Sequence, residues 1–170
     1  MSQLDEIDCA ILDILQHEGR ISILDLAERV GLSATPCARR VKRLEDEGVI
    51  ERYAAVLNPR LLGKQLDVFV NVRLRNSTSK AIEIFERAIK SMPEVVECYL
   101  VTGTYDYLVH IRVDDIDDFK NYVREHLIGI ASVGETVSSI ALEQTKYNSF
   151  LDLEARLSKT TTHDLEHGRR

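Results

Sequence analysis

The stretch Val30–Gly48, VGLSATPCARRVKRLEDEG, gathers four cationic side chains in a chain that has more acidic than basic residues. Ser33 is of a type that favours the N-cap of a helix, Pro36 is tolerated in a first turn, and Gly48 is placed to end the helix. The stretch therefore predicts one capped helix with a concentrated positive charge, carried by Arg39, Arg40, Lys42 and Arg43.

The side chains of this helix fall on two faces. An advance of about 100° per residue places Cys37, Val41 and Leu44 together on an apolar face. The opposite face carries Thr35, Arg39, Lys42 and Arg43, with Arg40 at its flank. That face offers hydroxyl and cationic groups to a partner. The acidic residues 45–47 would repel phosphate, so we expect nucleic-acid contact on the N-terminal half of the helix.

Two more helices are predicted before this one. The first begins at Asp5 as N-cap and ends near Gly19. Its apolar stripe consists of Ile7, Ile11, Ile14 and Leu15. The second helix begins at Ser22 and ends at Gly31. Little more than Gly31 and Leu32 then separates it from the third helix, which is the tight turn of a helix-turn-helix motif.

A helix-turn-helix motif places the N-terminal part of its second helix in the major groove of DNA, where arginine can donate two hydrogen bonds to guanine and other cations meet phosphates. A charge cluster alone is more often a solvated face, but the three-helix pattern and the tight turn favour DNA reading. We therefore expect a DNA-binding domain of winged type over residues 1–57. Its predicted contacts are Ser33, Thr35, Arg39, Arg40, Lys42 and Arg43.

The pattern of apolar residues changes after Gly48. Residues 49–57 predict a strand-like arm, and residues 58–65, opened by Asn58-Pro59, predict a hinge. Alternating apolar and polar residues over 66–75 predict a strand with one buried face. A helix at 79–92, strands at 95–101 and 107–113, a helix at 115–130 and a strand at 136–147 are expected next. This order predicts a ferredoxin-like βαββαβ domain over residues 66–148, hence an α+β fold, with a C-terminal tail at 149–170.

Such a sheet carries its helices on one face and leaves the other face bare. Alternation along the strands places Phe69, Tyr99, His110 and Ile140 on the bare face. Exposed apolar surface of this extent favours association, so the sequence predicts that subunits pair through this face.

Composition limits the remaining possibilities. The formal net charge of −6 argues against a protein that coats nucleic acid over its whole surface, so contact must come from a local patch. No segment approaches the roughly 20 apolar residues of a membrane span, and the first residues lack the pattern of a signal peptide, which predicts a cytoplasmic protein with no membrane partner. Cys9, Cys37 and Cys98 are expected to be buried core residues.

The sequence lacks the motifs typical of enzymes and metal sites. The sequence has no glycine-rich phosphate loop, nucleophile elbow or His-Glu-x-x-His spacing, so we expect no catalytic residue, no metal ligand and no cofactor. The acidic run Asp114, Asp115, Asp117 and Asp118 lacks the spacing of a calcium loop. We expect Asp114 or Asp115 to cap the helix that follows.

Taken together, these residues resemble the Lrp/AsnC (leucine-responsive regulatory protein) family of transcription regulators. The resemblance extends from Leu4 to about Asn148. It rests on Asp5–Leu12, on the block from Gly19 to Ile50, on Leu57–Pro59, and on Val101–Val109 with the sequence VTGTYDYLV. It implies a C-terminal ligand-binding domain, dimers formed through the sheets and further assembly into octamers. It also implies that a small amino acid binds between neighbouring subunits.

The resemblance also implies an effector site. One wall is the loop Thr102, Gly103, Thr104, Tyr105, Asp106 and Tyr107, and the other consists of Gly134, Thr136, Ser138 and Ser139. A glycine lets backbone amides approach a carboxylate, and Asp106 can pair with an α-ammonium group. The alternative is that Gly103 only forms the turn and Asp106 only caps it. The segment IASVGET lacks the proline that many relatives carry there.

The function that we expect is sequence-specific DNA binding by a transcription regulator whose DNA affinity or assembly responds to a small amino acid. Its expected partners are double-stranded DNA, the amino acid and further copies of the chain. Two alternatives remain open at this stage: a non-catalytic ligand-binding module that acts on a protein partner, and an architectural protein that binds DNA regardless of ligand.

Overall fold

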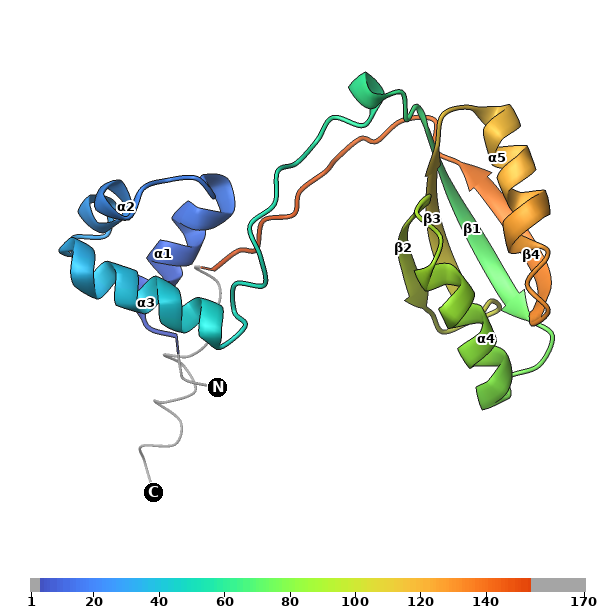
Figure 1. Ribbon diagram of the computed structural model, residues 1–170, viewed down its shortest axis with the longest axis horizontal. Helices are drawn as coiled ribbons and strands as arrows, with labels where there is room; N and C mark the ends of the chain where they lie inside the picture. Colours follow the sequence, from blue (N-terminus) through green and yellow to red (C-terminus); the bar gives the residue numbers. More distant parts are fainter. Residues whose placement is uncertain (1–3, 154–170) are drawn as a thin grey trace. The chain divides into compact units, whose positions relative to one another are not determined.

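The computed structural model describes residues 4–153 and divides the chain into two units (Figure 1). The N-terminal unit combines residues 4–56 with residues 147–153. The sheet unit consists of residues 57–146. The predicted division is therefore altered at the C-terminal end, because the chain rejoins the N-terminal unit from Tyr147 onward. Residues 154–170 of the expected tail lie outside the described residues.

The N-terminal unit contains the three predicted helices, α1 (Glu6–His17), α2 (Ile23–Arg29) and α3 (Ala34–Asp46). Asp5 caps α1 by accepting a hydrogen bond from the amide of Asp8, and the Asp8 carboxylate accepts one from the amide of Asp5 in return. The Ser22 hydroxyl caps α2. Buried apolar side chains from all three helices form one core, namely Ile11, Leu26, Ala27, Cys37, Val41 and Leu44. The predicted stripe on α1 and apolar face on α3 are thus confirmed.

The arm that follows α3 differs from the predicted strand. Residues 51–58 adopt no regular secondary structure and are mostly exposed. A β-ladder requires a partner for its backbone groups, and no segment within residues 4–153 pairs with the arm. The hinge contains a short 3₁₀ turn at Arg60–Leu62.

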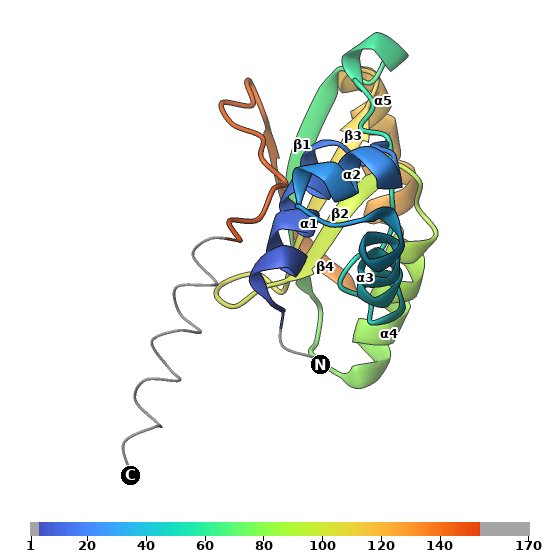
Figure 2. The same cartoon turned by 90° about the vertical axis from the view of Figure 1, so that its left-hand side faces the viewer.

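The sheet unit has the predicted order of elements. These are β1 (Leu66–Leu74), α4 (Ser79–Lys90), β2 (Val95–Leu100), β3 (Tyr107–Val113), α5 (Ile116–Tyr122) with a π-helical continuation (Val123–Leu127), and β4 (Val133–Ile140). The strands lie in the order β2-β3-β1-β4, and neighbouring strands are antiparallel. Both helices cover the same face of the sheet (Figures 1 and 2). The predicted βαββαβ domain is confirmed. Asp115 caps α5, as expected.

The last strand begins and ends earlier than predicted. Its pairing with β1 runs as far as Val68 opposite Ile140, and the amide of Ala141 still bonds to the carbonyl of Asp67 at 2.9 Å. Beyond that point β1 has given way to the hinge. The predicted strand residues 142–147 therefore have no ladder to join.

The two faces of the sheet differ as the alternation predicted. Side chains facing α4 and α5 are buried, among them Val68, Val70, Val72, Val109, Ile111 and Val113. On the bare face Phe69 and Tyr99 are 37% and 52% exposed. The expected position of Ile140 was wrong. Ile140 lies opposite Val68, and directly opposed residues of an antiparallel pair share a face, so Ile140 lies on the helix side.

All three cysteines occupy buried or half-buried positions. Cys9 and Cys37 are buried, and Cys98 is half-buried against the core of the sheet unit. Burial raises the pKa of the Cys98 thiol to about 11, so it is protonated at neutral pH. Within residues 4–153 no helix is long and apolar enough to cross a membrane.

Candidate DNA interface and effector site

The outer face of α3 carries an exposed polar stripe. Thr35, Arg39 and Lys42 follow one another at spacings of four and three residues, and all three are exposed. Ser33 precedes them at the N-cap position, but its hydroxyl makes no capping hydrogen bond to the helix. Lys42 approaches Asp46 at 3.4 Å, and both side chains are more than half exposed, so this ion pair is weak. These side chains are open to a partner.

Arg40 and Arg43 are placed differently. Arg40 donates to Asp5 at 2.6 Å and to Asp8 at 2.8 Å, and Arg43 donates to the other carboxylate oxygen of Asp8. The Asp8 side chain is only 1% exposed. A carboxylate removed from water requires cationic or hydrogen-bonding partners, which explains why both guanidinium groups turn to it. We expected Arg43 on the outer face of α3, but its guanidinium group is directed to α1.

This ion-pair cluster of Asp5, Asp8, Arg40 and Arg43 connects the start of α1 to the middle of α3. Burial raises the pKa of Asp5, but the amide of Asp8 and the guanidinium group of Arg40 outweigh it, and the pKa lies below its ordinary value. Its hydrogen bonds to the carboxylates of Asp5 and Asp8 raise the pKa of Arg40. Two of the four cations on α3 are therefore neutralised inside the unit, and their bonds fix how α3 sits on α1.

The predicted effector loop lies at the end of β1. Gly103 has a φ of 121°, which only glycine adopts readily, so it shapes the turn between β2 and β3. The Asp106 carboxylate accepts a hydrogen bond from the amide of Leu74 at 2.7 Å, and the Asp106 amide donates to the carbonyl of Val72. Thr102, Gly103 and Thr104 are exposed, and Tyr105 and Asp106 are half-buried. Asp106 thus already has a structural role, and it retains a second carboxylate oxygen.

Tyr107 differs from the rest of this loop. It is 2% exposed, and its hydroxyl donates to Glu86 on α4 at 3.1 Å. Burial and the nearby Glu86 carboxylate raise the pKa of Tyr107 to about 12. Tyr107 therefore supports the loop from the core.

The second predicted wall divides between the two faces of the sheet. Thr136 lies opposite Val72, which also pairs with Tyr107, so Thr136 lies one strand away from the loop on the helix side. Ser138 also lies on the helix side, opposite Val70. Ser139 lies opposite Phe69 on the bare face. A side chain at Gly134 would meet the backbone of Arg73 and Arg75 at 3.2–3.3 Å, so the glycine permits close approach of β4 to β1.

Arg73, which is not among the predicted site residues, connects the loop to β4. Its Nε donates to the carbonyl of Thr104 at 3.1 Å, its guanidinium group lies 5.3 Å from the ring centre of Tyr105, and it pairs with Glu135 at 3.2 Å. The alternation of apolar and polar residues along β1 places Arg73 on the polar face, near the end of the strand. That signal could have indicated it.

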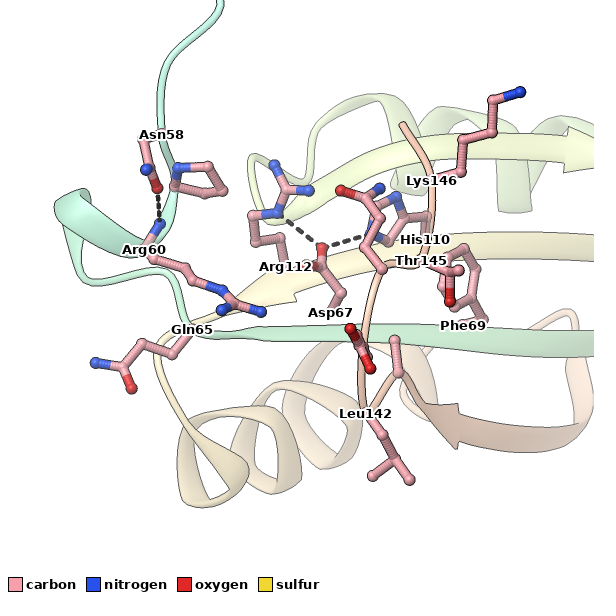
Figure 3. Close-up of a pocket in the computed structure, with 14 residues that line it drawn as sticks. Asn58, Arg60, Gln65, Asp67, Phe69, His110, Arg112, Leu142, Thr145 and Lys146 are labelled. Atoms are coloured by element: carbon pink, nitrogen blue, oxygen red, sulfur yellow. Dashed lines mark hydrogen bonds and ion pairs between the residues drawn. The ribbon is translucent and has the colours of Figure 1, made fainter. Parts of the chain in front are cut away.

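The bare face carries a second ion-pair cluster, at the opposite end of β1. Asp67 accepts hydrogen bonds from Arg112 and His110, each at 2.7 Å (Figure 3). The ring of His110 stacks on Phe69 at 4.6 Å. These side chains form the floor of a groove of about 780 Å³, walled by the hinge and by residues 141–146. Within the described residues no group of three His, Cys, Asp or Glu side chains is arranged to hold a metal ion.

Comparison with known proteins places both units in one family. Residues 4–51 match the winged helix-turn-helix DNA-binding family, and residues 67–151 match the Lrp/AsnC ligand binding domain. The leucine-responsive regulatory protein of Escherichia coli is 40% identical over 153 residues, which cover 90% of this chain and 93% of the relative. The relative from Salmonella typhimurium gives the same values.

Solved structures agree with the sequence relatives. A transcriptional regulator from Neisseria meningitidis, crystallised as its complex with L-methionine, superposes with a TM-score of 0.87 at 36% identity, covering 91% of this chain and 99% of the other. An AsnC family transcriptional regulator from Agrobacterium tumefaciens gives 0.84 at 36% identity, covering 89% and 99%. This chain belongs to the Lrp/AsnC family of DNA-binding transcription regulators.

Proposed function

We propose that this chain reads DNA with the exposed stripe of α3 and changes its DNA occupancy when an amino acid binds the sheet unit. The observation that carries the proposal is the division of the α3 cations. Arg39 and Lys42 are exposed beside Thr35, while Arg40 and Arg43 are held by Asp8. Base edges would be read by Arg39, together with the hydroxyls of Ser33 and Thr35, and Lys42 would meet phosphate.

Arg40 and Arg43 have a different role in this proposal. A guanidinium group has several N–H donors, so each arginine can keep its bond to Asp8 and still present a remaining N–H group to a phosphate. Their contribution to DNA binding is then mainly to hold α3 at the angle that the major groove requires. Removing them would weaken reading by displacing the helix.

The proposed effector is a small amino acid at the loop Thr102–Asp106. Support comes from the match of residues 67–151 to the Lrp/AsnC ligand binding domain and from the methionine complex of the Neisseria regulator. The exposed amides beside Gly103 can receive a carboxylate, and the second oxygen of Asp106 can receive an ammonium group. Gly134, Thr136, Ser138 and Ser139 belong to the proposed opposite wall, and Tyr107 supports the loop from behind.

The chain is also proposed to act as a homo-oligomer, with at least a dimer formed through the bare face of the sheet. Phe69, Tyr99 and Val137 are 37%, 52% and 42% exposed there. A second copy of the same face would cover these side chains. Symmetric pairing suits DNA sites with two related halves, and octamers are the further assembly that we expect.

The experiment is a fluorescence-anisotropy titration of the full chain on DNA from upstream of its own coding region, at two salt concentrations, with and without each proteinogenic amino acid. Binding that weakens steeply with salt and shifts with an amino acid is the expected result. The coupling must be reciprocal, so saturating DNA must change the affinity for that amino acid by the same factor. Salt-sensitive binding that no amino acid changes would reject the effector proposal in favour of an architectural protein.

A further inference from the structure

The last described residues form an interaction with α1 that neither DNA reading nor effector binding accounts for. After β4 the chain returns to the N-terminal unit, to which residues 147–153 belong (Figure 1). We call residues 147–153 the returning segment. The sheet unit is thus joined to the N-terminal unit at two points of the chain, between residues 56 and 57 and between residues 146 and 147.

Gln16 on α1 holds the returning segment by its main chain. Its side-chain amide accepts a hydrogen bond from the amide of Leu151 at 2.9 Å and donates one to the carbonyl of the same residue at 3.0 Å. Asp13, one turn earlier, accepts a bond from the same Gln16 nitrogen at 3.0 Å and so orients it. A planar amide that pairs with both backbone groups of one residue imitates the pairing of a neighbouring strand.

Ring and apolar contacts accompany this pair of hydrogen bonds. The Phe150 ring lies 4.2 Å from the ring of His17, and the amide of Phe150 is held by the side chain of Asn148. The segment also lines a groove of about 760 Å³ in the N-terminal unit. Its apolar walls come from Leu4, Leu12, Leu15, Val49, Ile50 and Tyr53, and the returning segment contributes Leu151 and Leu153.

The sequence module and the structural unit do not end at the same residue. The Lrp/AsnC ligand binding domain matches as far as residue 151, yet from residue 147 the chain belongs structurally to the N-terminal unit. The last residues of the effector module are therefore bound to the DNA-binding module. In contrast, the arm of residues 51–57 has no ladder partner among the described residues.

We propose that the contact between α1 and the chain's own returning segment is a coupling surface, and that Gln16 is the positioning residue that holds the segment there. The inference rests on the proposed function, because it assigns this contact to the coupling between amino-acid binding and DNA occupancy. Leu151 is 72% exposed although its backbone is bonded. A contact made by two exposed hydrogen bonds and one ring pair opens readily, as an element that must differ between two states has to do.

The test compares Gln16→Leu with Gln65→Leu in the full chain. Gln65 is an exposed glutamine of the sheet unit with no side-chain partner among the described residues, so it provides the same chemical change elsewhere. Two quantities are measured in each variant. The first is hydrogen exchange at the Leu151 amide. The second is the ratio of DNA dissociation constants with and without an amino acid, starting with L-methionine and L-leucine and extending to the others.

In Gln16→Leu the Leu151 amide is expected to exchange several-fold faster, and the ratio is expected to move at least threefold toward 1. Binding of the amino acid to DNA-free protein should stay within twofold of the unmodified chain, since the effector loop is untouched. Gln16→Glu keeps the acceptor but places a carboxylate oxygen against the Leu151 carbonyl, so it should behave like Gln16→Leu. Gln65→Leu should leave both quantities unchanged.

Two outcomes contradict the inference in different ways. The coupling surface would be overturned if Gln16→Leu kept the ratio of DNA dissociation constants of the unmodified chain, or if the exchange rate at Leu151 did not change. Either result would leave the proposed function standing. A ratio of 1 for every amino acid in the unmodified chain would overturn the proposed effector response, and the coupling surface with it.

Discussion

Asp8 and Asp67 each hold two cations, but in opposite settings. Asp8 is fully buried in the N-terminal unit and binds Arg40 and Arg43, which come from a different helix. Asp67 is 31% exposed on the bare face of the sheet and binds its cross-strand neighbours Arg112 and His110. The first cluster fixes one helix on another. The second leaves charge accessible on the face where we propose that a second copy docks. Burial therefore separates a carboxylate that positions a helix from one that stays accessible at the proposed interface.

The largest effect is expected when the buried carboxylate is removed. Asp8→Ala deletes one half of the α1 cap and leaves two partly buried guanidinium groups without their main partner. We expect the free energy of unfolding of the N-terminal unit to fall by about 3 kcal/mol. Urea denaturation measures it. Glu6→Ala removes an exposed carboxylate from the same turn and should cost well under half as much, so equal losses would contradict a special role for Asp8.

A milder substitution at Asp8 separates the positioning of Arg40 and Arg43 from the folding of the N-terminal unit. Asp8→Asn keeps the shape of the side chain but frees charge on Arg40 and Arg43 for phosphates. Binding to DNA of unrelated sequence should then become more salt-dependent, by up to about 0.9 in the slope of log K against log salt for each added phosphate contact. Preference for the specific site should fall at the same time. Glu6→Gln is the matched control for loss of one negative charge, and an Asp8→Asn slope no steeper than that of Glu6→Gln would reject the idea.

The equivalent substitution on the bare face should have a smaller effect on the stability of a single chain. Asp67→Asn weakens the bonds to Arg112 and His110, which are themselves partly hydrated, so we expect a loss of about 1 kcal/mol in the sheet unit. Hydrogen exchange of β1 amides measures it. The association of subunits, followed by sedimentation, should change more than the stability does. An unaltered assembly would argue against the bare face as the interface.

The smallest effect is a dependence on pH. Burial raises the pKa of Asp67, but the hydrogen bonds from Arg112 and His110 and their charges outweigh it, and the pKa is lowered. A carboxyl group whose folded pKa lies below its unfolded value of about 3.9 stabilises the fold above that value, and the contribution disappears as pH falls through the folded pKa. The stability difference between the unmodified chain and Asp67→Asn should therefore be constant at pH 5–6 and shrink below pH 4. A difference that grows on acidification would contradict the sign.

Much of the fold could be predicted because its elements are encoded locally. The cap residues Asp5, Ser22 and Asp115 and the alternation of β1 each depend on a few neighbouring residues. The end of β4 could not be predicted in this way. It depends on where β1 gives way to the hinge, which is information from a segment about 70 residues away in the sequence.

The site was predictable to a similar degree. A helical wheel separates Arg39 and Lys42 from the core, but it also placed Arg43 with them. The wheel contains no information on Asp8, which lies 35 residues away and attracts Arg43 because it is buried. Likewise, the register that places Ser138 and Ser139 on different faces requires the pairing with β1. Long-range partners, rather than local propensity, decide which charged residue is open to a ligand.

The most direct test of the account compares two pairs of cations with the same spacing. Arg39→Ala with Lys42→Ala removes the exposed cations of α3, and Arg87→Ala with Lys90→Ala removes an exposed arginine and lysine three residues apart on α4. Affinity for the specific DNA is measured by anisotropy at one salt concentration. We expect the α3 variant to bind roughly tenfold to a thousandfold more weakly than the α4 variant, with both folded. Equal affinity of the two variants would contradict the claim that the outer face of α3 reads DNA.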